Sequence, residues 1–232
     1  MPPTQRTARI AGLLYLLTFV SIPTLSLYRG LKTPGYAVGA GPADASSSAL
    51  LAAFLEIVVA LACIGTAVAL YPLVRRQSTS LALGFVGART LEAAMIFSGV
   101  ASILTLISVR DPAASGATAV ALTVQGEALV GHYGFAFLLG QSLMPGINAL
   151  LLGTLLYRSR LVPRVLPLIG LIGAPIHLTA VLLTFFGVIT AISPITLFAA
   201  LPIALWEFSL GVYLLTRGVR QPAGLEGQPA AP

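Results

Sequence analysis

The sequence predicts an all-α integral membrane protein, a bundle of six transmembrane helices. Hydrophobic residues make up 57% of the 232 residues and charged residues only 9%, whereas soluble domains carry about 25% charged residues. The mean hydropathy is +0.95. The apolar residues gather in six runs, each long enough for the helix of about 20 residues that crosses a bilayer.

The six runs define the expected elements. They lie at residues 10–28, 49–74, 81–109, 128–157, 165–189 and 194–216. The first is too long and lacks the cleavage site of a signal peptide, so we expect a retained helix, bent near Pro23. Residues 30–48 are expected to be irregular, and residues 120–124 to form a separate interfacial helix. Residues 1–220 then form a single membrane domain, followed by a disordered tail at 221–232.

The distribution of basic residues orients the helices. One predicted side carries nine of the 13 basic residues, the other side carries three, and Arg89 lies within the third span. The nine are Arg6, Arg9, Arg75, Arg76, Arg158, Arg160, Arg164, Arg217 and Arg220, and the three are Arg29, Lys32 and Arg110. Because cytoplasmic loops are enriched in Lys and Arg, we expect a multi-pass protein of the bacterial plasma (inner) membrane with both termini in the cytoplasm.

Charge and cysteine content exclude several function classes. The formal charge of +6 comes from residues that bracket the apolar runs, so membrane topology explains it and we expect no nucleic-acid partner. Cys63 is the sole cysteine, which rules out an intramolecular disulfide and dithiol redox chemistry. No nucleophile motif stands out, and no catalytic residue is assigned.

Polar residues inside the spans are the candidate functional residues. Counted from the expected cytoplasmic ends at about 1.5 Å per residue, five of them fall about 13–18 Å deep. They are Arg89, Glu92, Asn148, His177 and Glu207. Arg89 and Glu92 are three residues apart and share a helix face, so Glu92 is the local partner of the arginine, with Glu207 as a second candidate. Buried ionisable groups usually face a functional interior, so we interpret the layer as ligand-binding or proton-titrating.

A secondary polar site is expected nearer the outer face. It comprises Glu56, His132 and Gln141. Pro145 follows Gln141 by one helical turn, and a proline inside a span bends the helix and leaves a backbone carbonyl without its partner. The kink is therefore expected to shape a cavity or to serve helix packing alone.

Other interpretations of the inner layer remain open. Buried polar groups can fix helix register without any chemistry. A metal site of Glu92, His177 and Glu207 is disfavoured because Arg89 would repel the cation, and no metal-binding spacing is present. A haem held by His132 and His177 is disfavoured because their depths differ by several turns. No metal or cofactor is assigned.

Four stretches resemble a bacterial membrane-protein family catalogued as domain of unknown function 4386. They are residues 9–16 (RIAGLLYL), 88–93 (ARTLEA), 155–164 (LLYRSRLVPR) and 214–220 (LLTRGVR). The resemblance extends from Arg9 to Arg220 and includes Glu207. It implies a small polytopic plasma-membrane protein and carries no established activity.

The leading functional hypothesis is the binding or proton-linked translocation of a small, partly apolar molecule. Glu92 and Glu207 would titrate, Arg89 would be the counter-ion, and His177 and Asn148 would contact the ligand. One alternative is an intramembrane enzyme acting on a lipid or isoprenoid, and another is a non-catalytic helper or sensor. The expected partners are the lipid bilayer, a small-molecule or lipid ligand, and further copies of the chain in a homo-oligomer.

Overall fold

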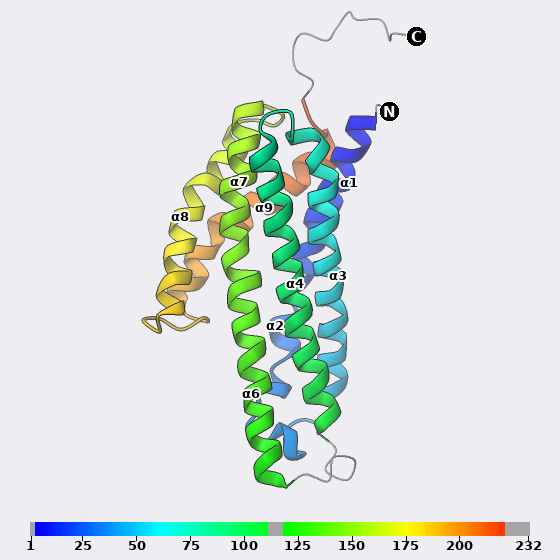
Figure 1. The fold of residues 1–232 in the computed structure, drawn as a ribbon, viewed down its shortest axis with the longest axis vertical. Coiled ribbons are helices and arrows are strands. Elements are labelled where there is room, and N and C mark those ends of the chain that lie inside the picture. Colours follow the sequence, from blue (N-terminus) through cyan, green and yellow to red (C-terminus); the bar gives the residue numbers. More distant parts are fainter. Residues whose placement is uncertain (1–2, 111–117, 221–232) are drawn as a thin grey trace, which may run out of the picture. The chain divides into compact units, whose positions relative to one another are not determined.

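The computed structural model describes residues 3–110 and 118–220, and within those ranges it contains helices and turns but no strand. Six helices are long and apolar enough to cross a membrane. They are Pro3–Leu27, Ala45–Val74, Thr79–Val109, Ala119–Ser159, Val165–Phe185 and Pro194–Arg217. The expected fold class, an all-helical polytopic membrane protein with six spans, is confirmed (Figure 1). The tail expected at 221–232 lies outside the described residues.

The first span is interrupted next to Pro23. The helix α1 (Pro3–Leu17) passes into the 3₁₀ turn η1 (Thr18–Ser21), and the short helix α2 (Thr24–Leu27) follows. Proline lacks a backbone N–H and its ring crowds the preceding turn, so a regular α-helix cannot continue through it. The interruption was expected from the sequence and leads the chain to Tyr28, which caps α2.

The segment after the first span is more ordered than expected. It contains two 3₁₀ turns, η2 (Gly30–Lys32) and η3 (Tyr36–Val38), and the side chains of Leu31 and Tyr36 are buried. The left-handed backbone at Gly35 and Gly39, with φ of 76° and 92°, lets the chain turn tightly on both sides of η3. The expectation of an irregular loop was wrong because buried apolar residues hold these turns in place.

The second and third spans are the helices α3 (Ala45–Val74) and α4 (Thr79–Val109). The fourth span is α6 (Ala119–Phe137), the π-helical turn η4 (Leu138–Leu143) and α7 (Met144–Ser159) in direct succession. Residues 120–124 are the first turns of α6 and not a separate helix, because Thr118 caps α6 by accepting a hydrogen bond from the Ala121 N–H. The π turn lies where Pro145 predicted a kink, and its wider spacing accommodates the proline ring.

The last two spans, α8 (Val165–Phe185) and α9 (Pro194–Arg217), pack against each other as a hairpin (Figure 1). Glycines allow the close approach: a Cβ on Gly170 would lie 2.6 Å from Cδ2 of Trp206, and one on Gly173 would lie 2.6 Å from Cβ of Pro202. The helix α8 ends four residues earlier than expected, since Gly187 takes a left-handed φ of 72°. Ser193 and Thr196 form a capping box that starts α9.

The helices belong to two compact units. The first consists of Met1–Leu16, Gly65–Ala88 and Pro145–Pro232, and the second of Leu17–Ile64 and Arg89–Met144. The core of the first unit surrounds Trp206 and Tyr15, whose rings meet edge to face at 6.4 Å. The second unit has one apolar cluster around Tyr28 and Tyr133 and another around Cys63.

Candidate functional site

The carboxylate of Glu56 is the centre of a buried polar network in the second unit. Glu56 lies on α3 and is 0% exposed. The Tyr133 hydroxyl donates a hydrogen bond to its Oε1 at 2.8 Å, and Nε2 of Gln141 donates to the same oxygen at 3.2 Å. The Tyr28 hydroxyl donates to Oε2 at 3.2 Å. Three donors thus offset a desolvation cost of several kcal/mol for a buried carboxylate.

An interrupted helix, a contact between two rings and a π-helical turn position these donors. Tyr28 reaches the network because the first span is broken at Pro23 and ends at α2. Its ring meets that of Tyr133 edge to face, with centroids 5.0 Å apart and planes at 61°. Gln141 lies within the π turn η4, where the wider spacing changes which residues face the interior. Pro145 therefore contributes to the network indirectly, because it shapes the backbone of the π turn that carries Gln141.

Lys32 adds a positive charge beside the network. Its Nζ lies 5.1 Å from the centroid of the Tyr133 ring, within the range of a cation–π contact. Burial lowers the pKa of Lys32, and the charge of Glu56 acts in the opposite direction. Burial, followed by the charge and hydrogen bond of Glu56, raises the pKa of Tyr28, so its hydroxyl remains protonated and continues to donate. These contacts therefore bring together one carboxylate, two phenol hydroxyls and one amine.

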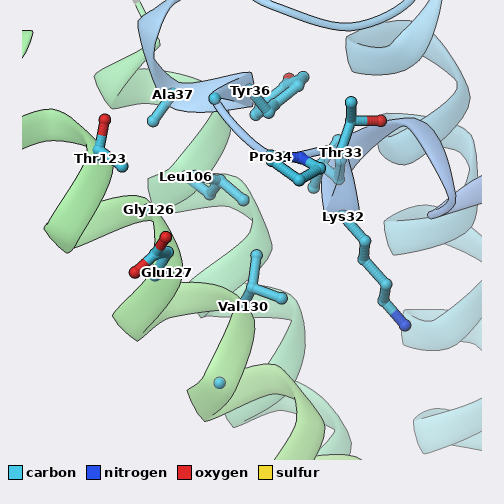
Figure 2. Close-up of a pocket in the computed structure, with 13 residues that line it drawn as sticks. Lys32, Thr33, Pro34, Tyr36, Ala37, Leu106, Thr123, Gly126, Glu127 and Val130 are labelled. Atoms are coloured by element: carbon cyan, nitrogen blue, oxygen red, sulfur yellow. The ribbon is translucent and has the colours of Figure 1, made fainter.

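A cavity of about 340 Å³ also lies within the second unit, and Lys32 is among its lining residues (Figure 2). Leu31, Tyr36, Leu106 and Val130 form much of its apolar lining. Lys32, Glu127 and the hydroxyls of Thr33 and Thr123 add polar groups. Figure 2 shows the Lys32 ammonium group directed away from Glu127. The volume is within the range of about 300–1,000 Å³ typical of small-molecule sites.

Arg89 and Glu92 form the expected buried ion pair. Nη1 of Arg89 donates to Oε2 of Glu92 at 3.0 Å, and the two side chains are 1% and 6% exposed. The same Nη1 also donates to Sγ of Cys63 at 3.4 Å. The i,i+3 spacing predicted the first contact, whereas the second joins α4 to α3 and could not be deduced from spacing.

The remaining residues of the expected inner layer lie in the first unit. Asn148 on α7 and His177 on α8 are buried, and Glu207 on α9 is half-buried. A Cβ added to Gly146 would lie 3.4 Å from Cδ2 of His177, so the imidazole packs closely against α7 near Asn148. Arg89 and Glu92 belong to the second unit. A joint site of all five residues therefore remains a prediction.

The expected outer residues are only partly brought together. Glu56 and Gln141 are hydrogen-bonded to each other, as described above. His132 has a different partner, since its Nε2 forms a hydrogen bond of 2.9 Å with Oγ of Ser98 on an exposed face of α4 and α6. Sequence reasoning missed Tyr28, Tyr133 and Lys32. Their positions near the ends of spans are typical of interfacial residues, and the sequence gives no sign of their convergence.

Within residues 3–110 and 118–220, no group of three or more His, Cys, Asp and Glu side chains is close enough to hold a metal ion.

These features define a polytopic α-helical membrane protein with polar groups buried among its spans. The chain belongs to the family described as domain of unknown function DUF4386, whose model matches residues 10–218. The resemblance noted in the sequence is thereby confirmed. Comparison with curated proteins gave no match, and comparison with solved structures gave none either.

Proposed function

We propose that this protein binds a small, partly apolar molecule within the membrane and translocates it together with a proton. One observation carries the proposal: a fully buried carboxylate, Glu56, is held by three donors, and Lys32, which lies over the ring of one of them, also lines a cavity. Ionisable groups are retained inside spans mainly where they bind ligands or relay protons. We place the protein in a bacterial plasma membrane with both termini in the cytoplasm.

In this proposal Glu56 gains and loses the transported proton. When Glu56 is ionised, hydrogen bonds from Tyr28, Tyr133 and Gln141 stabilise its negative charge. The positive charge of Lys32, which lies over the Tyr133 ring, balances it. Protonation of Glu56 would leave Lys32 without its counter-charge and change the electrostatics of the cavity that it lines. Ligand occupancy and proton occupancy are therefore coupled through one lysine.

The inner polar layer supplies the second part of the proposal. In the buried Arg89–Glu92 pair, Arg89 would be the anion anchor or counter-ion and Glu92 a second titrating group. In the first unit, Glu207 would titrate, and His177 and Asn148 would contact the ligand. Homo-oligomers remain part of the proposal, and nucleic acid is not an expected partner.

The first test is native mass spectrometry of the full-length protein released from its own membranes. We expect a small molecule to be retained by the wild type and lost from Glu56→Gln, which keeps the shape of the side chain but removes its charge. His132→Asn is the matched control, because His132 pairs with Ser98 outside the network.

The second test uses the released molecule in proteoliposomes. Its uptake should follow an imposed pH gradient in the wild type and in His132→Asn, and should lose that dependence in Glu56→Gln. Retention of the same molecule and the same pH dependence by Glu56→Gln would overturn the assignment. A wild-type protein that is released from its membranes without any bound molecule would favour a structural role for the network.

A further inference from the structure

A second open cavity lies in the first unit and is lined mainly by arginines. Its volume is about 400 Å³, and its lining residues are Arg160, Val162, Pro163, Arg164, Val165 and Arg220. No acidic residue is among them. The topology of a membrane protein requires arginines on one side of the bilayer, but it does not require three of them to line one cavity.

The backbone of the first part of this cavity is fixed. Arg160 follows the end of α7 in a left-handed conformation with φ of 56°, which a non-glycine residue rarely adopts. Two residues later, Val162 is 0% exposed and anchors the connector in the core of the first unit. The arginine is therefore presented by a turn that tertiary packing maintains.

The segment that carries Arg220 is also held in place. The Arg220 N–H donates to the carbonyl of Leu161 at 2.7 Å, which fastens the two cavity segments together. The Gln5 side chain clamps the preceding residue: its Nε2 donates to the carbonyl of Val219 at 2.6 Å, and its Oε1 accepts from the Val219 N–H at 3.1 Å. Val219 itself is buried. Arg220 is thus attached to a fixed backbone.

The start of α8 supplies a third feature. Arg164 is the N-cap of this 21-residue helix, whose first backbone N–H groups and dipole favour an anion. Its guanidinium group lies 4.9 Å from the centroid of the Tyr157 ring, which restrains the side chain. Guanidinium groups bind phosphate oxygens in a bidentate manner, so three of them at a helix N-terminus suit a phosphate group.

We propose that Arg160, Arg164 and Arg220 form a binding site for a phosphate group. The site is separate from the proposed function, since all its lining residues lie in the first unit and none belongs to the Glu56 network. The phosphate is that of an anionic lipid headgroup or of a soluble phosphate compound. Both sources share the same chemistry, and the experiment distinguishes them.

The test compares two triple variants of the full-length protein that lose the same charge. Arg160→Gln/Arg164→Gln/Arg220→Gln removes the site, and Arg9→Gln/Arg75→Gln/Arg76→Gln is the control. The control is well matched because the Arg75 guanidinium lies 5.8 Å from the Tyr71 ring, as Arg164 lies over Tyr157. Binding of phosphatidylglycerol and phosphatidylcholine is measured by native mass spectrometry in neutral detergent.

We expect the site variant to bind phosphatidylglycerol at least about tenfold more weakly than the wild type, and the control to change less than about twofold. A soluble source is tested with inorganic phosphate and pyrophosphate in phosphatidylcholine nanodiscs. If these anions raise the Tm of the wild type and the control but not of the site variant, the ligand is soluble. If only phosphatidylglycerol binds, it is a lipid headgroup.

If the triple variant fails to fold, the milder variant Arg164→Lys replaces it in the test. This variant keeps the positive charge and therefore the topology. Since lysine lacks the planar fork of donors, we expect it to bind the phosphate compound severalfold more weakly than the wild type. Equal losses in the site and control variants would mean that only net charge matters, and would overturn the proposal. Absence of binding by both phosphatidylglycerol and the soluble phosphates would overturn it as well.

Discussion

At the scale of single residues, Glu56 and Arg89 are buried charged groups of the second unit that are solvated in different ways. Glu56 is held by neutral donors from three other segments, whereas Arg89 is held by a charged neighbour on its own helix. A carboxylate held by several neutral donors can change its protonation state while the surrounding side chains remain in place. An arginine cannot lose its proton in practice. In the function proposed above, this contrast makes Glu56 the group that exchanges the proton and Arg89 the group that keeps its charge.

Removing one donor should weaken the Glu56 network measurably. Tyr133→Phe deletes the shortest hydrogen bond to the carboxylate and leaves part of its charge unsolvated, at a cost of about 1–3 kcal/mol in the free energy of unfolding. Denaturation in detergent, followed by circular dichroism, measures the change. Tyr71→Phe is the control, since the ring of Tyr71 is the part that contacts Arg75. Equal stabilities of the two variants would contradict a role for the hydroxyl.

Substitutions of Arg89 and Glu92 should have non-additive effects on the free energy of unfolding. Arg89→Leu removes the ion pair of the buried Glu92 and should cost about 3–5 kcal/mol. The double variant Arg89→Leu/Glu92→Leu should be more stable than either single variant, because it leaves no unpaired charge. A double-mutant cycle on thermal or denaturant unfolding measures the coupling. A parallel cycle of Arg89→Leu with Glu207→Leu tests whether Glu207 shares the arginine, and additive losses there would exclude it.

The pH dependence of stability should report on Lys32. Burial lowers its pKa below the ordinary value of 10.5, so the folded state binds fewer protons than the unfolded state between the two values. Stability therefore rises with pH in that window. Lys32→Met should lack this contribution, and the wild type should gain stability relative to the variant as pH approaches about 10. A constant difference between their Tm values from pH 7 to pH 10 would argue against a lowered pKa.

At the scale of elements, apolar length was sufficient to predict the six spans, but local backbone chemistry set their ends. Gly187 ends α8 early, and the Thr118 cap starts α6 before the expected boundary. The pairing of Arg89 with Glu92 was predictable because both lie on one helix face. The hydrogen bonds from Tyr28 and Tyr133 to Glu56 span 28 and 77 residues along the chain, and no periodicity in a single sequence specifies such contacts.

Contact between α8 and α9 depends on small residues and gives a prediction at this scale. Gly170→Ala would place a methyl group within 2.6 Å of the Trp206 ring, which is 0% exposed and cannot move freely. Overpacking of this kind costs about 1–3 kcal/mol. Gly131→Ala is the matched control, because nothing described lies within 4 Å of its added Cβ and alanine favours a helix. Comparison of Tm values in detergent measures both, and a stable Gly170→Ala would mean that the hairpin can separate.

At the scale of the whole molecule, the Glu56 network and the arginine-lined cavity lie in different units. The acid–phenol–amine network and the Arg89–Glu92 pair both lie in the second unit, whereas the arginine-lined cavity lies in the first. The two functions proposed for these sites should therefore be separable. The triple arginine variant should retain the pH-dependent uptake that Glu56→Gln loses, as measured in the same proteoliposomes.

The α8–α9 hairpin has a consequence for how the chain enters the membrane during synthesis. From Val165 to Trp206 there is no Asp, Glu, Lys or Arg, and His177 is the single residue there that titrates near neutrality. If both termini lie in the cytoplasm, as proposed above, carrying the tip of this hairpin across the bilayer moves no fixed charge. A membrane potential contributes about 2.3 kcal/mol per charge per 100 mV, so it performs almost no work on this segment. In that orientation, the segment that contains Arg29, Lys32 and Asp44 must move all three charges instead. The last two helices are therefore suited to insert as a pair without an energised membrane.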